Sequence, residues 1–227
     1  MNDLDVQTEY WDSVAASKTF THPTPLSVFR DLLPPAAKIL DYGCGYGRIC
    51  SELTEAGYHN VIGIDISEKM IKRGKHLNAS LDLRVFDGRS ADFPDGFFDA
   101  CLLMAVLTCI PSDVGQNRTI AEVHRLLRPS GIIFVSDYPL QTDVRNQKRY
   151  REFEKELGTF GLFRTEGAVV RHYDMERIQQ LLSGFDVLWQ NSIRVCTMNG
   201  NESDVFQIAA RRKKAANKAL NRDNSAN

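Results

Sequence analysis

Three glycines at alternate positions, Gly43, Gly45 and Gly47, constrain the fold of this chain of 227 residues more than any other feature. The apolar run 38–42 precedes them, and residues 48–56 follow with apolar side chains at helical spacing. The segment therefore predicts a strand, a tight turn and a helix. Glycine suits such a turn because the chain reverses sharply there and its backbone can touch a ligand without Cβ atoms in the way.

The residues after this turn continue as alternating strands and helices. Strands are predicted at 61–65, 83–86, 98–104 and 132–136, and helices at 67–77 and 118–127, with a turn at 129–131. Residues 61–65 are too apolar to face water on either side, which is typical of a parallel sheet covered on both faces. Because strands and helices alternate throughout, we predict an α/β fold with a doubly wound, mostly parallel sheet and helices on both faces.

The last part of the chain predicts a different arrangement. Residues 174–183 have helical spacing, and residues 185–198 form a long predicted strand. The sequence Asn-Gly-Asn at 199–201 then leads into a second apolar run, 204–210. An Asn-Gly turn between two apolar strands indicates a hairpin, so the final strand should run antiparallel.

Changes in composition divide the chain into five segments. These are a helical lid segment (1–35), a ligand-binding core (36–137), an insertion contributing to the substrate site (138–173), a C-terminal helix and β-hairpin completing the sheet (174–212) and a basic flexible tail (213–227). In the first segment, residues 26–33 predict a helix. Tyr10, Trp11 and Phe20 fit either a lid that walls a pocket or core aromatics packed on the sheet. The tail fits either a solvated end or a contact with an anionic partner.

Composition excludes several classes of protein. With 43% hydrophobic residues the chain can bury one good core, and its net charge of −1 argues against a nucleic-acid partner. Its five cysteines are odd in number, lack C-x-x-C spacing and lie partly in apolar runs, which disfavours a disulfide scaffold or a zinc site. No apolar run approaches membrane-spanning length. We expect a soluble cytoplasmic protein.

The glycine spacing points to one family. Dinucleotide sites use G-x-G-x-x-G, whereas this chain has Asp41 followed by G-x-G-x-G. This form resembles motif I of the class I S-adenosylmethionine-dependent methyltransferases, and the resemblance extends over residues 40–210. It implies a Rossmann-like sheet of seven strands that ends in an antiparallel strand. It also implies that S-adenosylmethionine is the methyl donor and that the core, 36–137, binds it.

The resemblance implies a cofactor site at the carboxyl edge of the sheet, where such folds bind ligands. Its residues are Asp41, Gly43, Gly45, Gly47, Asp65, Ile66, Asp87, Gly88, Met104 and Ala105. Asp65 would accept two hydrogen bonds from ribose hydroxyl groups, and Ile66 would cover one face of adenine. Asp87 would accept from the exocyclic amine of adenine, beside the Gly88 backbone.

The same resemblance implies contacts to the methionine part of the cofactor. The carbonyl groups of Met104 and Ala105 would meet its ammonium group, and Asp41 would help to bind it through water. Taken singly, Asp65 and Asp87 also fit the role of helix N-cap residues. Three carboxylates at three successive strand ends favour one shared ligand.

His22 and His172 are the candidate general bases. A histidine titrates near neutral pH and can accept a proton from a hydroxyl or ammonium acceptor. Either of them also fits a surface or structural role, as we expect for His59, His76 and His124.

Two sequence features that this chain lacks narrow the range of possible methyl acceptors. Residues 103–108 lack the Asn/Asp-Pro-Pro-aromatic motif of family members that methylate exocyclic amines of bases or glutamine. Met104 stands near the place where metal-dependent, catechol-type members have acidic ligands, so no metal ion is expected. We therefore predict methyl transfer to an O, N or C atom of a small-molecule metabolite, by a monomer or homodimer with no membrane partner.

Other functions remain open. The chain could methylate RNA or protein, with the insertion and the basic tail as a docking surface, although the insertion balances its charges. It could also be a catalytically silent partner subunit that binds S-adenosylmethionine. The function of a nicotinamide-dependent dehydrogenase is less favoured than these, because the glycine spacing differs from that of dinucleotide sites.

Overall fold

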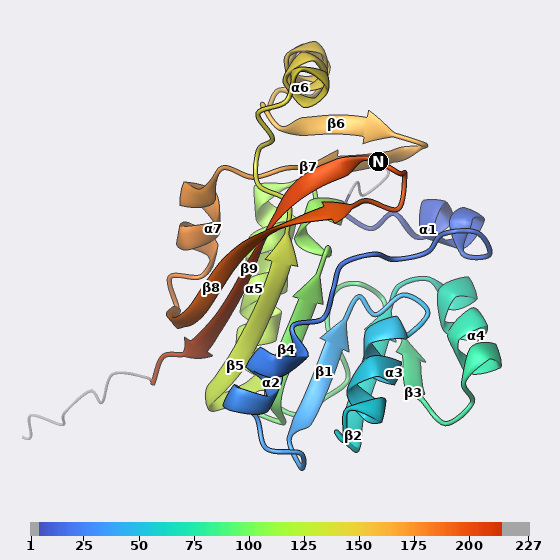
Figure 1. The fold of residues 1–227 in the computed structure, drawn as a ribbon, viewed down its shortest axis with the longest axis vertical. Helices are drawn as coiled ribbons and strands as arrows, with labels where there is room; N and C mark the ends of the chain where they lie inside the picture. The colour runs from blue at the N-terminus through green and yellow to red at the C-terminus, as the bar shows by residue number, and fades with distance from the viewer. Residues whose placement is uncertain (1–4, 215–227) are drawn as a thin grey trace, which may run out of the picture.

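The computed structural model describes residues 5–214, in which seven strands form one sheet (Figure 1). They are β1 (Lys38–Tyr42), β2 (Asn60–Asp65), β3 (Asp82–Val85), β4 (Phe98–Met104), β5 (Leu127–Asp137), β8 (Phe185–Cys196) and β9 (Glu202–Arg212). Their order in space is β3-β2-β1-β4-β5-β9-β8. All pairs from β3 to β5 are parallel, and β9 runs antiparallel to both of its neighbours. The predicted fold class and the antiparallel last strand are confirmed.

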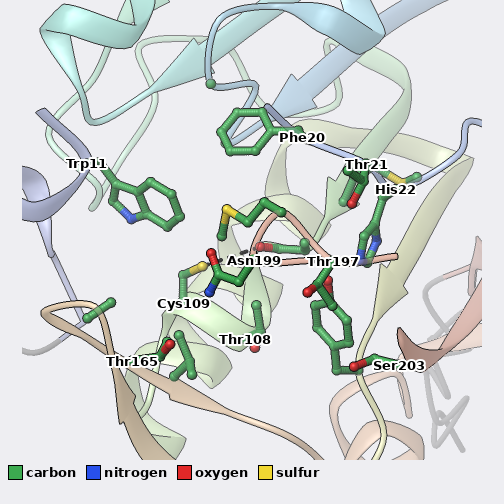
Figure 2. A pocket seen from close by; sticks show the side chains of 18 of the residues that line it. Trp11, Phe20, Thr21, His22, Thr108, Cys109, Thr165, Thr197, Asn199 and Ser203 are labelled. Atoms are coloured by element: carbon green, nitrogen blue, oxygen red, sulfur yellow. Dashed lines mark hydrogen bonds between the residues drawn. The ribbon is translucent and has the colours of Figure 1, made fainter. Parts of the chain in front are cut away.

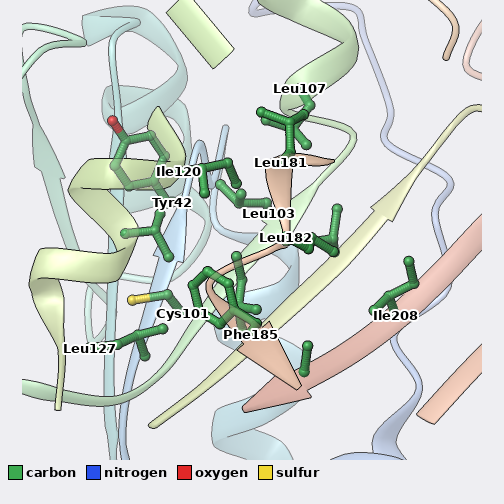
Figure 3. Close-up of a cluster of buried hydrophobic side chains, with 14 of the residues drawn as sticks. Tyr42, Cys101, Leu103, Leu107, Ile120, Leu127, Leu181, Leu182, Phe185 and Ile208 are labelled. Atoms are coloured by element: carbon green, nitrogen blue, oxygen red, sulfur yellow. The ribbon is translucent and has the colours of Figure 1, made fainter. Parts of the chain in front are cut away.

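Helices cover both faces of this sheet because successive strand residues point to opposite sides. The helices are α1 (Thr8–Val14), α2 (Leu26–Leu32), α3 (Arg48–Glu55), α4 (Glu68–Leu77), α5 (Asp113–Leu126), α6 (Val144–Leu157) and α7 (Met175–Leu181). Ile39 of β1 belongs to the buried cluster that contains Phe29 of α2. The next residue, Leu40, belongs to the opposite cluster, with Ile120 of α5 and Leu181 of α7 (Figure 3).

No helix connects β3 to β4 within residues 86–97, so the prediction of strict alternation is wrong at this point. Pro94 lacks a backbone N–H, and Gly96 has a φ of 67°, both of which disfavour a helix. Arg125 of α5 donates instead to the carbonyl groups of Ala91 and Phe93, at 3.0 and 2.8 Å. This guanidinium group replaces the hydrogen bonds that a helix would have supplied.

Two boundaries also differ from the sequence prediction. Helix α5 begins at Asp113 rather than residue 118, because the Ser112 side chain caps it by accepting from the Gly115 N–H at 2.9 Å. The turn predicted at 129–131 is an irregularity inside β5, where Ser130 has a φ of 64°. The register of β5 with β4 shifts there.

The insertion forms a layer of its own beside the sheet. Helix α6 is followed by β6 (Leu162–Thr165) and β7 (Ala168–Arg171), an antiparallel pair in a separate two-stranded sheet (Figure 1). Helix α1 lies against α4, whereas α2 packs on the main sheet. The predicted tail, 213–227, lies outside the described residues apart from its first two.

Candidate functional site

A cavity lies at the carboxyl ends of β1, β2 and β4, where the predicted cofactor residues gather. Its wall includes Asp41, Gly43, Gly45, Asp65, Met104 and Ala105. An adjacent cavity shares Gly43, Asp65 and Ala105 with it and adds Ile66 and Gly88. Gly47 and Asp87 line neither of these two cavities. Most of the predicted cofactor residues therefore meet around one continuous region.

The glycine turn needs glycine for both its backbone angles and its contacts. Gly43 and Gly45 have φ angles of 78° and 55°, which are unfavourable for other residues. A Cβ atom on Gly45 would overlap the ring of Phe20, which stacks on Tyr46 with a centroid distance of 5.1 Å. At Gly47, with a φ of 76°, an added Cβ would lie 2.9 Å from the Leu83 side chain. Gly47 thus serves the packing of the turn.

Asp65 connects the glycine turn to the next helix. Its carboxylate accepts from the Gly45 N–H and from the Ser67 N–H, each at 2.8 Å. Ser67, rather than Asp65, caps α4 by accepting from the Met70 N–H. Burial raises the pKa of Asp65 to about 6, against the opposing effect of these hydrogen bonds. A carboxylate has about four acceptor positions, so these two hydrogen bonds do not use all of them.

Asp87 differs from Asp65 in its surroundings. It is exposed, and its side chain accepts from the N–H groups of Arg89 and Ser90, at 2.8 and 3.2 Å. Its neighbour Gly88 lines the second cavity together with Ile66. Ile66 and Gly88 thus line the second cavity, whereas Asp87, which the sequence also predicts as an adenine-binding residue, does not.

The remaining predicted cofactor residues lie deep in the first cavity. Asp41 is 1% exposed, burial raises its pKa to about 7, and the Cys50 thiol lies 3.4 Å from its carboxylate. Ala105 has a φ of 57°, and its N–H donates to the Ser136 carbonyl group at 2.7 Å. A strained non-glycine residue at this place is typical of a functional site.

The two candidate bases lie on either side of one tyrosine in the same cavity. The ring of Tyr138 is 4.9 Å from His22 and 5.1 Å from His172, on which it stacks. Nδ1 of His172 is bonded to the Tyr150 hydroxyl group at 2.6 Å. Nδ1 of His22 lies 3.2 Å from the Ser136 hydroxyl group. Nε2 of His22 is buried and has no hydrogen-bond partner among residues 5–214.

Both histidines are neutral at neutral pH. Burial and the nearby Arg48 lower the pKa of His22 to about 4. Burial lowers the pKa of His172 well below its ordinary value, with further effects from Arg149 and Arg145. A neutral imidazole keeps one ring nitrogen free to accept a proton.

Sequence reasoning missed several residues of the cavity wall. Besides the expected aromatic residues of the N-terminal segment, the wall contains Arg48, Thr108, Arg145, Arg149, Asn199 and Ser203. Figure 2 shows Trp11, Phe20, His22 and Asn199 directed into the same space. The spacing of the two α6 arginines was a readable signal, because residues four apart share a helix face. Asn199 belongs to the predicted hairpin turn, but nothing in the sequence placed that turn over a cavity.

Lys18 joins three segments around the cavity. Its ammonium group forms an ion pair with Glu166, between β6 and β7, and donates to the Asn199 side chain at 2.6 Å. The Lys18 side chain is only 12% exposed. We call these contacts the Lys18 junction. They hold the N-terminal segment, the insertion and the β8–β9 turn together.

Metal-ligand clusters and membrane-spanning helices are both absent from residues 5–214. No group of three or more His, Cys, Asp and Glu side chains in this part of the chain is arranged to hold a metal ion. No helix in this range is long and apolar enough to cross a membrane.

Known proteins resemble this chain in sequence and in structure. Residues 40–135 match the model of a methyltransferase domain. The solved structure of a SAM-dependent methyltransferase from Methanosarcina mazei is similar to this chain with a TM-score of 0.79 and 26% sequence identity. The match covers 85% of this chain and 99% of that one.

Curated relatives are similar over part of their length. The eEF1A lysine and N-terminal methyltransferase of Bos taurus is 30% identical over 134 residues, 54% of this chain and 19% of that protein. The 2-methyl-6-phytyl-1,4-hydroquinone methyltransferase of Synechocystis sp. is 30% identical over 135 residues, 58% of this chain and 42% of that protein. The chain thus spans less than half the length of these relatives. Together, the glycine turn, the seven-stranded sheet and the matched domain support the identification of this chain as a class I S-adenosylmethionine-dependent methyltransferase.

Proposed function

We propose that this chain is an enzyme that binds S-adenosylmethionine across the two cavities and transfers its methyl group to an O, N or C atom of a small-molecule metabolite. The observation that carries the proposal is the Asp65 carboxylate, which lies in the wall of both cavities and is fixed by the Gly45 and Ser67 N–H groups. A carboxylate held in this way is preorganised to accept from ribose hydroxyl groups.

The two cavities suit different parts of the donor. In the second cavity, Ile66, Phe86 and Gly88 offer an apolar slot for adenine. In the first, Asp41 and the Met104–Ala105 backbone offer acceptors for the ammonium group of the methionine part. The donor's sulfonium group is already a strong electrophile, so the protein mainly has to align the acceptor with the methyl group and exclude water.

His22 is the base that we propose for acceptors that must lose a proton. Its Nε2 is buried in the cavity wall without a partner in residues 5–214, whereas His172 is bonded to Tyr150 and stacked on Tyr138. His22→Gln should lower kcat roughly 100-fold, the lower range of a lost general base, and leave the affinity for S-adenosylhomocysteine unchanged. Equal kcat in both proteins, measured with a hydroxyl or ammonium acceptor, would remove His22 from this role.

Asp65→Asn tests the donor site itself. The amide keeps one acceptor oxygen but loses the charge, so the affinity for S-adenosylhomocysteine should fall by ~1–3 kcal/mol in calorimetric titration. Asp186→Asn is the matched control, because Asp186 is exposed on β8, lines neither cavity and has Lys213, at 3.9 Å, as the ion-pair partner of its carboxylate within residues 5–214. The proposal fails if folded wild-type protein does not bind S-adenosylmethionine or its demethylated product.

A protein acceptor is the second candidate, because one of the relatives is named as an eEF1A lysine and N-terminal methyltransferase. Enclosure of the cavity by three segments joined at Lys18 favours a small acceptor instead. Labelled methyl transfer to the low-molecular-weight fraction of a cell extract, compared with its protein fraction, distinguishes the two. We further propose that the enzyme acts in the cytoplasm, as a monomer or homodimer and without a metal ion.

A further inference from the structure

Two arginines of the insertion, Arg145 and Arg149, line the cavity that holds the candidate bases. They lie one helical turn apart on α6, so they share a face of that helix. Neither forms an ion pair with any acid among residues 5–214. The Nε of Arg149 is buried and without a hydrogen-bond partner in the same range.

The acids of the cavity lie elsewhere. The carboxylates in its wall are Asp41 of β1 and Asp65 of β2, which belong to the proposed donor site. Asp143, two residues before Arg145, is bonded to the N–H and the side-chain amide of Asn146. Glu152, three residues after Arg149, is exposed and forms no ion pair with it. Asp143 offsets part of the positive charge of Arg145 and Arg149 from a distance, but no carboxylate among residues 5–214 forms an ion pair with either guanidinium group. Burying a guanidinium group without a counter-charge is costly unless a ligand supplies one.

Arg149 is half-buried and held in place, whereas Arg145 is exposed at the rim of the cavity. The guanidinium carbon of Arg149 lies 3.5 Å from the centroid of the Phe163 ring, a cation–π contact with β6. The bond between Tyr150 of α6 and His172 joins this helix to the end of β7. The Gln141 N–H donates to the same Tyr150 hydroxyl group at 3.2 Å. A fixed guanidinium fork suits a planar or tetrahedral oxyanion, because less entropy is lost when the hydrogen bonds form.

The remaining wall on this side combines apolar and aromatic side chains with polar ones such as Thr165, Asn199 and Ser203. It includes Tyr10, Tyr138, Phe163, Ala168, Val170 and Met198. Such a wall buries hydrocarbon or an aromatic ring, and a few polar groups then fix the orientation of the ligand.

We propose that the methyl acceptor is an anionic small molecule, whose carboxylate or phosphate group binds Arg145 and Arg149 while its apolar part lies against the aromatic wall. This inference rests on the proposed function. The methyl group goes to a different atom of the same molecule: that atom's electron pair forms the new bond to the methyl carbon, and the S–CH₃ bond breaks. Its electron pair stays on sulfur, which gives S-adenosylhomocysteine, and an O–H or N–H acceptor loses its proton to His22.

The experiment uses the full chain and labelled S-adenosylmethionine. A low-molecular-weight cell extract is separated on an anion-exchange resin at pH 7, and each fraction is offered to the enzyme. Acceptor activity should be retained on the resin. Treating the active fraction with alkaline phosphatase identifies the source of the charge, because a phosphate acceptor then loses its retention and a carboxylate acceptor keeps it.

The variants are compared on the active fraction. Arg145→Gln with Arg149→Gln should raise the apparent KM at least tenfold, and Arg149→Lys should raise it less, because it keeps the charge without the fork. Arg151→Gln is the matched control: Arg151 lies on the same helix, is exposed and is absent from the cavity wall. All variants should bind S-adenosylhomocysteine equally, which shows that they are folded.

Acceptor activity in the unretained fraction overturns the inference, and so does an unchanged KM in the double variant. If no fraction is methylated although S-adenosylhomocysteine binds, the proposed enzymatic function itself fails, and the inference falls with it. If the wild type does not bind S-adenosylhomocysteine, the proposed donor site is wrong. The three failures are therefore distinguishable.

Discussion

At the scale of single residues, the glycine turn depends on one contact between distant parts of the chain. Phe20 comes from the N-terminal segment and packs directly on Gly45, which also donates its N–H to Asp65. The middle glycine is therefore required by an aromatic ring of the protein as well as by its φ of 55°. Any side chain there must displace Phe20 or distort the turn that orients the Asp65 carboxylate.

Gly45→Ala should consequently impair donor binding. The left-handed backbone costs an alanine about 1–2 kcal/mol, and overlap with Phe20 adds to this. We expect the affinity for S-adenosylhomocysteine to fall at least tenfold in calorimetric titration. Gly57→Ala is the matched control, because Gly57 has a φ of 97° and open space around its Cβ position. Equal affinities of the two variants would show that the contact with Phe20 does not matter.

Some site residues could be found from the sequence because backbone requirements dictate them. The glycine turn and Asp65 follow from the strand–turn–helix pattern, which fixes their place at the sheet edge. For Arg149, the sequence indicates only that it shares a helix face with Arg145, and not that this face borders the cavity. The path of α6 past the cavity depends on the bond between Tyr150 and His172, two residues that are 22 positions apart. No local pattern contains such a contact.

At the scale of secondary-structure elements, the Lys18 junction links three segments around the cavity. Lys18→Met keeps the length of the side chain but removes its bonds to Glu166 and Asn199. Amide hydrogen exchange at 166–169 and 197–201 should then rise roughly five- to thirtyfold, the factor for 1–2 kcal/mol of local opening free energy.

The control for this experiment is Lys72→Met, since Lys72 is exposed on α4. If exchange at the two turns is the same in Lys18→Met as in this control, the junction contributes nothing to their stability.

Elements with strong periodicity were predicted, whereas those held by distant contacts were not. Strands β1, β2 and β4 are buried apolar runs, and their positions follow from the sequence to within about two residues. Helix α1 has seven residues, none of them buried, and no side-chain cap. The Asp12 carboxylate fixes it by accepting from the Ser67 hydroxyl group at 2.6 Å and the Lys69 N–H at 3.1 Å. Such a helix depends on its neighbour rather than on its own sequence.

At the scale of the whole molecule, the buried histidine makes stability depend on pH. The pKa of His22 is about 4 in the folded protein and 6.5 in its unperturbed state. Between these values the unfolded chain binds more protons, so the free energy of unfolding falls as the pH falls. From pH 6.5 to pH 5 the loss should be roughly 1–2 kcal/mol greater in wild type than in His22→Gln.

Urea unfolding at both pH values measures this difference. The raised pKa values of Asp41 and Asp137, each about 7 through burial, act in the opposite sense, but they are present in both proteins and cancel. If wild type and His22→Gln lose the same free energy of unfolding between the two pH values, His22 is accessible to protons in the folded state.

The separate layer formed by the insertion has an evolutionary consequence. Strands β6 and β7 pair with each other rather than with the main sheet, and α6 packs on β6. The portion that we assign to acceptor choice can therefore vary, or be exchanged by recombination, while the donor machinery stays intact. A chimaera that receives residues 138–173 from a relative would inherit that relative's preference for acceptors and keep its own affinity for the methyl donor.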